Sequence, residues 1–198
     1  MVCLTYLQTG YVTVMDFTRF FSKIAGVFLV TGFCSHAYAQ SDPDWTPFLK
    51  SFENACKFSG DLETFFNEMI LIENDPSDPM NAHKIGKLVI PEKYKSAISP
   101  EGITRTDKGD TAEYSISVTS GTYHGLKVQA ITAELGIGQG FDVKKIILNI
   151  SFNEAKQRLK KVKFMTENDD VFGRDIGAHV GPLEENKTLT VISCDTAP

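Results

Sequence analysis

The chain has 198 residues and a formal net charge of −5, with 42% hydrophobic and 23% charged residues. This composition is that of an ordinary globular protein, and it excludes collagen, low-complexity chains and chain-wide disorder. The acidic balance also argues against a nucleic-acid partner, because binding a phosphate backbone needs a basic field.

The first forty residues carry the pattern of a secretory signal. Arg19 and Lys23 form a small positive region, an uncharged run follows over 24–33, and Ala37 and Ala39 stand at A-x-A spacing after it. A basic region, an apolar region and small residues in this order are typical of a signal peptide that is removed after export.

Cleavage is expected after Ala39, which gives a signal peptide over 1–39 and a mature part over 40–198. We expect that mature part to be a single α+β domain, periplasmic or secreted. The uncharged run is too short for a spanning helix, which takes ~20 apolar residues, so no stable membrane insertion is expected after cleavage. A segment of normal signal-peptide length begins at Met15, and we expect translation to start there. The alternative to a cleaved signal peptide is that the uncharged run forms a retained N-terminal anchor or a buried helix.

Two of the four cysteines, Cys56 and Cys194, lie in the expected mature part. In an oxidising compartment, two such cysteines are predicted to form one disulfide. Chain-entropy reasoning gives a loop of this size a stabilisation on the order of 5 kcal/mol. The alternative is a redox-active or nucleophilic thiol, but the sequence contains no C-x-x-C motif.

The mature part opens with two apolar stripes at helical spacing. Ser59-Gly60-Asp61 separates them, so the sequence predicts an N-terminal helical hairpin. The stripes are Trp45, Phe48, Leu49, Phe52 and Cys56, and then Leu62, Phe65, Phe66, Met69 and Ile70.

An acidic segment over 73–81 carries two prolines and is predicted to be a loop. Asp75 and Asp78 in it are candidate binding residues, because clustered carboxylates suit cations and basic partners. The segment lacks the ligand order of an EF-hand loop, so no metal site is predicted.

Strands are predicted after the acidic segment, because apolar and polar residues alternate or apolar residues run together between turn residues. A helix is expected to begin at Ser151, and residues 166–187 are expected to be mostly loop. The predicted strands are 88–90, 113–119, 126–131, 141–150 and 188–194. The fold class is therefore predicted to be α+β: an N-terminal helical hairpin packed on a twisted antiparallel sheet of about 4–6 strands, with one further helix.

Tyr123 and His124 are candidate binding residues, because they lie together in a turn between two predicted strands. The glycines of 136–140 invite a phosphate-loop interpretation, but a strand follows them where such a loop needs a helix. No G-x-S-x-G elbow and no His-Glu-x-x-His motif is present. We therefore expect no cofactor and assign no catalytic residue.

These features favour a small exported, non-enzymatic binding or inhibitor protein of the immunity type. Its partner is expected to be a basic envelope protein met by the acidic loops. One alternative is a periplasmic carrier of a lipid or another apolar ligand, with a cavity near Phe65 and Phe66. Another is a small hydrolase whose site is assembled in space around His124 or His179. The sequence leaves the oligomeric state open.

Overall fold

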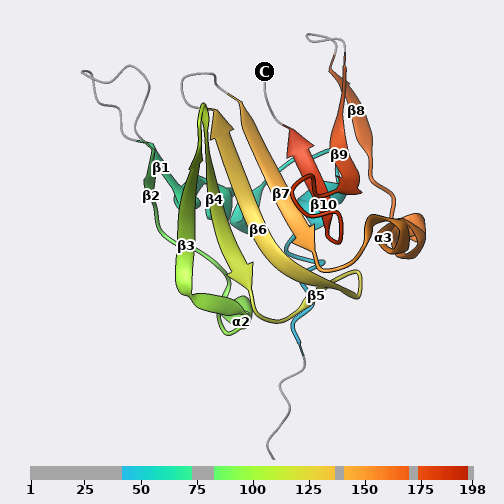
Figure 1. Cartoon of the computed structure of the whole chain (residues 1–198), viewed down its shortest axis with the longest axis horizontal. Coiled ribbons are helices and arrows are strands. Elements are labelled where there is room, and N and C mark those ends of the chain that lie inside the picture. Colours follow the sequence, from blue (N-terminus) through green and yellow to red (C-terminus); the bar gives the residue numbers. More distant parts are fainter. Residues whose placement is uncertain (1–41, 73–82, 137–140, 170–173, 196–198) are drawn as a thin grey trace, which may run out of the picture. The chain divides into compact units, whose positions relative to one another are not determined.

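The computed structural model describes residues 42–72, 83–136, 141–169 and 174–195. Strands are the main secondary structure among these residues (Figure 1). The elements in chain order are η1 (Lys50–Glu53), α1 (Gly60–Met69), β1 (Ile70–Ile72), β2 (His83–Ile85), α2 (Glu92–Lys95), β3 (Ile98–Lys108), β4 (Thr111–Val118), β5 (Thr122–Tyr123), β6 (Leu126–Gly136), β7 (Asp142–Leu148), α3 (Phe152–Arg158), η2 (Leu159–Lys161), β8 (Thr166–Asp169), β9 (Arg174–Pro182) and β10 (Thr190–Asp195).

Eight of the described strands form one antiparallel sheet in the order β3-β4-β6-β7-β10-β9-β8, with β5 paired to the start of β6. The first four large strands follow one another as a meander. The chain then passes through α3 to the far edge of the sheet and returns, so that β10 lies between β7 and β9 (Figure 1). β1 and β2 pair as a separate two-stranded sheet.

The predicted fold class is wrong in its arrangement, although the chain does combine helices with strands. The main sheet is larger than the 4–6 strands expected, and the described helices are short. No N-terminal helical hairpin forms within the described residues: the second predicted helix exists as α1, but the first is reduced to the 3₁₀ helix η1.

The first helix fails because the backbone leaves the helical conformation at both ends of η1. Before η1, the Trp45 amide donates to the carbonyl of Thr122 in β5 at 2.7 Å. After η1, Ala55 and Cys56 have φ angles of 46° and 58°, in the left-handed region that ends a helix. The apolar stripe is nevertheless buried, so the spacing correctly identified the inward side chains while the backbone is mostly turn.

The structure has strands that the sequence interpretation left out. β8 and β9 lie where a loop was expected, β3 lies where no element was predicted, and residues 88–90 form no strand. β3 is exposed along most of its length, so it lacks the apolar alternation that reveals a half-buried strand. The strands predicted over 113–119, 126–131 and 141–150 are confirmed as the neighbouring strands β4, β6 and β7, and the expected final strand is β10.

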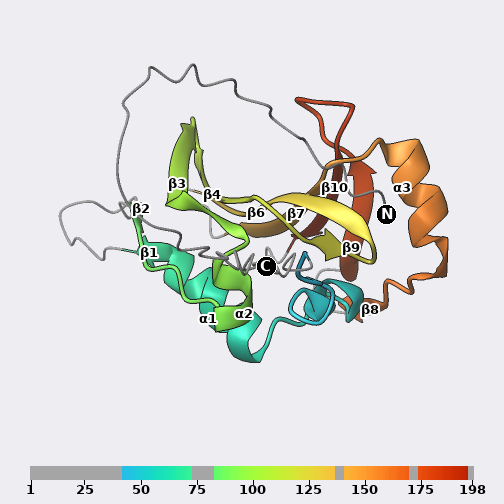
Figure 2. The same cartoon turned by 90° about the horizontal axis from the view of Figure 1, so that it is seen from below.

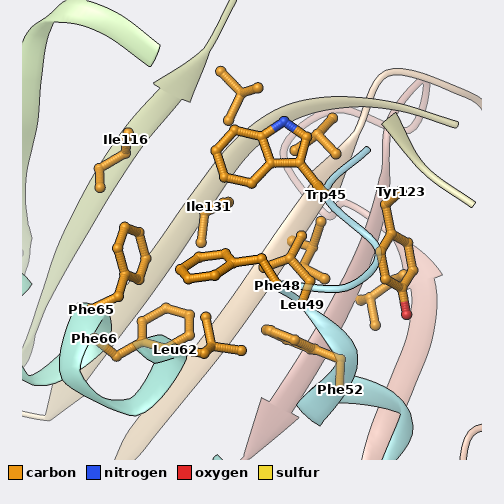
Figure 3. Packing of buried hydrophobic residues seen from close by; sticks show 14 of the residues in the cluster. Trp45, Phe48, Leu49, Phe52, Leu62, Phe65, Phe66, Ile116, Tyr123 and Ile131 are labelled. Carbon is orange, nitrogen blue, oxygen red and sulfur yellow. The ribbon is translucent and has the colours of Figure 1, made fainter. Parts of the chain in front are cut away.

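One face of the sheet carries the core, and η1, α1 and α2 cover it (Figure 2). Alternate residues of β4 are buried, as a strand with one covered face requires. Figure 3 shows rings from η1 and α1 grouped over isoleucines of the sheet. The labelled members of this cluster are Trp45, Phe48, Leu49, Phe52, Leu62, Phe65, Phe66, Ile116, Tyr123 and Ile131. Burial of each large apolar side chain contributes about 1.5–3 kcal/mol, so this layer is the main source of stability.

Cys56 and Cys194 form the predicted disulfide, with their Cα atoms 5.7 Å apart. Both residues are buried in the core cluster. The bond joins the segment that follows η1 to β10 in the middle of the sheet. It therefore holds η1, which carries part of the site described next, against the sheet.

Candidate functional site

Tyr123 and His124 lie at a tight turn between β5 and β6. Tyr123 pairs with Leu126, so His124 and Gly125 are the two loop residues. Their φ angles are 49° and 73°, and positive values at both positions are typical of a type I′ hairpin turn. A histidine is rare in this conformation, and the Thr46 hydroxyl helps to hold it by accepting the His124 amide at 2.8 Å.

Glu53 of η1 is the carboxylate that meets this turn. The side chain of Glu53 is only 7% exposed. His124 Nε2 lies 2.8 Å from Glu53 Oε1, and the Tyr123 hydroxyl donates to the same oxygen at 3.2 Å. Lys50 Nζ donates to the other oxygen, Oε2, at 2.6 Å. The buried carboxylate is thus held by three side chains from two separate parts of the chain.

Sequence reasoning did not find Glu53. Its position beside Phe52 fits the polar side of a predicted helix, and no local pattern places it next to a turn 71 positions away. The only sequence signal was the pair Tyr123-His124 itself, in a turn.

The charges in this cluster follow from burial and hydrogen bonding. Burial raises the pKa of Glu53, but hydrogen bonds from Lys50 and His124 and the charges on them lower it more, so its pKa lies below the ordinary value. Burial, together with the adjacent Glu53, raises the pKa of Tyr123 far above its ordinary value. Glu53 is therefore ionised and Tyr123 neutral at pH 7. An ionised carboxylate only accepts hydrogen bonds, so Nε2 of His124 carries a proton.

A surface hollow opens beside this cluster, and we call it the His124 cleft. It has a volume of about 670 Å³ and lies between η1, the β5–β6 turn and the α3–η2 segment. Its lining residues are Lys50, Glu53, Asn54, His124, Arg158, Lys161, Val162, Lys163 and Met165. Among these described residues are four cations and a single carboxylate, and that carboxylate is the buried, hydrogen-bonded Glu53. The exposed charge of the cleft is therefore positive.

The walls of the cleft are fixed by contacts outside it. The Met165 amide donates to the carbonyl of Glu53 at 2.9 Å, which ties η1 to the segment before β8. Arg158 donates from Nη2 to the carbonyl of Gly125 at 3.1 Å, which ties α3 to the His124 turn. Within the described ranges, neither Lys161 nor Lys163 forms an ion pair. Their ammonium groups are thus available to an anion.

His179, the other histidine considered in the sequence, is not among the residues that line this cleft. Asp75 and Asp78 lie outside the described residues. His179 is exposed on β9, and His83 is buried on β2, where burial and then the charge of Arg105 lower its pKa. Among the described candidates, Tyr123 and His124 lie together, and the structure adds Glu53 to them.

Over the described ranges, no cluster of three or more His, Cys, Asp or Glu side chains is arranged to bind a metal ion. In the same ranges, none of the helices combines the length and apolar character needed to cross a membrane. No protein-family model, curated protein or solved structure matches the chain.

Proposed function

We propose that this chain is an exported, non-enzymatic binding protein that receives an acidic group of a protein partner in the His124 cleft. The observation that carries the proposal is the charge of the cleft. Four cations line it, and its one carboxylate is buried and already hydrogen-bonded. An acidic side chain or a terminal carboxylate fits this arrangement, because complementary charge guides and orients association.

The sign of this charge changes the expected partner. The expectation of a basic partner rested mainly on the acidic segment 73–81, and residues 73–82 lie outside the described residues. The described hollow beside His124 is basic. The proposal therefore names an acidic partner in the envelope or outside the cell.

Two features support binding rather than hydrolysis at this cleft. His124 does lie beside a carboxylate, as a histidine base requires, but no serine, threonine or cysteine is among the described residues that line the cleft. The carboxylate of Glu53 also accepts hydrogen bonds from Lys50 and Tyr123, in addition to its contact with His124. The arrangement holds the turn in place, and the described lining supplies no hydroxyl or thiol nucleophile.

The packing of Phe65 and Phe66 gives no support to a carrier of apolar molecules. Both rings are at most 1% exposed, and they contact each other edge to face with centroids 5.2 Å apart. The ring of Phe48, before η1, packs on Phe65, and the ring of Phe58, after η1, packs on Phe66. An apolar ligand would have to displace this core.

Export is part of the proposal, and it is supported by the leader pattern of the sequence. The buried disulfide is compatible with an oxidising compartment. The intact mass of the product recovered from the cell envelope or the medium tests it. A chain that begins at Gln40 is expected, and a product that keeps the residues before Gln40 would contradict cleavage after Ala39.

The binding function is tested by titrating the ¹⁵N-labelled protein with tri-glutamate at low ionic strength. Shift changes are expected to gather at the His124 cleft. The double variant Lys161→Gln/Lys163→Gln should weaken binding about five- to tenfold, because each exposed ion pair contributes about 0.2–1 kcal/mol. The matched control is Lys156→Gln/Lys160→Gln, which removes two charges from the same segment but outside the cleft lining. Equal loss in both double variants, or shifts away from the cleft, would contradict the proposal.

A further inference from the structure

We propose that the His124 cleft is one half of a longer basic trough that crosses η1 and binds an extended acidic segment of the partner protein. This inference rests on the proposed function and adds the form of the ligand: a stretch of polypeptide with acidic and apolar side chains, rather than a single acidic group.

The second half of the trough is a hollow on the other side of η1, which we call the Lys93 hollow. It has a volume of about 460 Å³ and lies between η1, the start of α1 and α2. Its lining residues are Pro47, Phe48, Lys50, Ser51, Asn54, Lys57, Ser59, Asp61, Leu62, Pro91, Lys93 and Tyr94.

The two hollows adjoin, because Lys50 and Asn54 line both of them. Figure 2 shows the arrangement that allows this: η1 lies between α1 and α2 on one side and α3 and β8 on the other. Asn54 is exposed at the crossing and ends η1. Its side-chain amide can both donate to and accept from the backbone of a peptide laid across η1.

The positive charge continues from one hollow into the other. Lys93 and Lys57 add two exposed cations, whereas Asp61 adds one carboxylate. Lys57 pairs with Glu167 at 2.6 Å, but both side chains are more than half exposed. Such a pair contributes little stability, so a ligand carboxylate can replace Glu167 at small cost.

Apolar surface between the cations favours a peptide over another polyanion. Met165 is 52% exposed in the His124 cleft, and Val162 lies beside it in the lining. Pro47 and Pro91 supply apolar surface in the Lys93 hollow. A polypeptide can offer apolar side chains between its carboxylates, whereas polyphosphate offers charge alone. The trough therefore fits an acidic segment with interspersed apolar residues.

The experiment compares two labelled peptides by fluorescence anisotropy: tri-glutamate, and a decapeptide of alternating glutamate and leucine. The decapeptide is expected to bind at least tenfold more tightly, because it reaches both hollows at once. Lys57→Gln/Lys93→Gln should remove that gain and leave tri-glutamate binding within twofold. Lys161→Gln/Lys163→Gln should weaken both peptides, and Lys87→Gln/Lys187→Gln, which changes two exposed lysines outside both linings, should weaken neither.

The outcomes separate this inference from the proposed function. If tri-glutamate binds at the His124 cleft but the decapeptide gains nothing, the trough is wrong and the single-group function stands. If neither peptide binds, both fail. The variant Met165→Ser should weaken the decapeptide and leave polyphosphate binding unchanged. Polyphosphate binding as tight as that of the decapeptide, with no effect of Met165→Ser on either ligand, would overturn the assignment to a polypeptide.

Discussion

Glu53 and His124 are 71 positions apart in sequence, yet Oε1 of Glu53 lies 2.8 Å from Nε2 of His124. This contact joins the 3₁₀ helix η1 to the β5–β6 turn, and the Tyr123 hydroxyl bonds the same oxygen. The carboxylate therefore has a structural task in addition to its place in the cleft wall: it fixes the two elements between which the cleft opens.

Replacing Glu53 by glutamine is expected to lower the free energy of unfolding by about 1–3 kcal/mol, because Lys50, Tyr123 and His124 would lose a buried charged acceptor. Urea unfolding followed by the fluorescence of Trp45, the single and fully buried tryptophan, measures this. Glu92→Gln is the control, since Glu92 is 86% exposed and pairs only with the exposed Lys95; its effect should stay below about 0.5 kcal/mol. Equal effects of the two substitutions would show that the Glu53 contacts contribute nothing.

Stability should also fall on acidification in a way that depends on Glu53. Its pKa is lowered in the folded state, because the hydrogen bonds from Lys50 and His124 outweigh the effect of burial. A lowered folded pKa stabilises the fold fully above the unfolded pKa of about 4.3, and this contribution is lost as the pH falls through the folded pKa. In urea unfolding between pH 7 and pH 3, Glu53→Gln should therefore lose less stability than the original chain.

Glu134 provides an internal comparison for the same measurement. Burial raises its pKa, but the hydrogen bond and charge of Lys145 lower it more, so its folded pKa is also below the ordinary value. Glu134→Gln should also reduce the loss of unfolding free energy between pH 7 and pH 3. The effect should be independent of Glu53, because Glu134 lies on β6 with Thr111 and Lys145 as its partners. If neither substitution changes how the free energy of unfolding depends on pH, the lowered pKa values are not a source of acid sensitivity.

The sequence was informative where one local pattern determines the outcome. Helical spacing identified Phe48, Leu49 and Phe52 as buried, and strand alternation identified β4 and β6. The bond predicted between Cys56 and Cys194 is present. In each of these cases, the information lies in neighbouring residues or in residue type.

The sequence was uninformative where distant segments decide the backbone. Residues 45–56 have helical spacing, but the Trp45 amide bonds to β5 and the path of the segment must bring Cys56 to Cys194. Only a short 3₁₀ helix forms there. β8 is polar and its described side chains are exposed, so nothing in its composition marks it as a strand. The contact of Glu53 with His124 depends on the position of η1 over the sheet, which follows only from the completed fold.

The disulfide gives a further prediction. Cys56→Ala/Cys194→Ala should lower the free energy of unfolding by about 2–5 kcal/mol, because the unfolded chain is no longer restricted by a bond across 138 positions. Both cysteines are at most 5% exposed. Iodoacetamide should thus label them only after reduction in denaturant. Labelling of Cys56 or Cys194 in the native, unreduced protein would contradict a formed bond.

Gly121, which precedes β5, should tolerate no side chain. Its φ is +112°, and a Cβ there would lie 2.3 Å from Nε1 of Trp45, an indole that is fully buried and stacked on Tyr94. Gly121→Ala must therefore shift either the tryptophan or the start of the strand that carries Tyr123. We expect a loss of several kcal/mol, measured by urea unfolding, together with weaker tri-glutamate binding in the remaining folded protein.

Gly109→Ala is the matched control, because Gly109 has a φ of +69° but open space around its Cβ position. Its cost should be the backbone strain alone, about 1–2 kcal/mol. Similar losses for the two variants would mean that the contact with Trp45 is not a constraint on this turn.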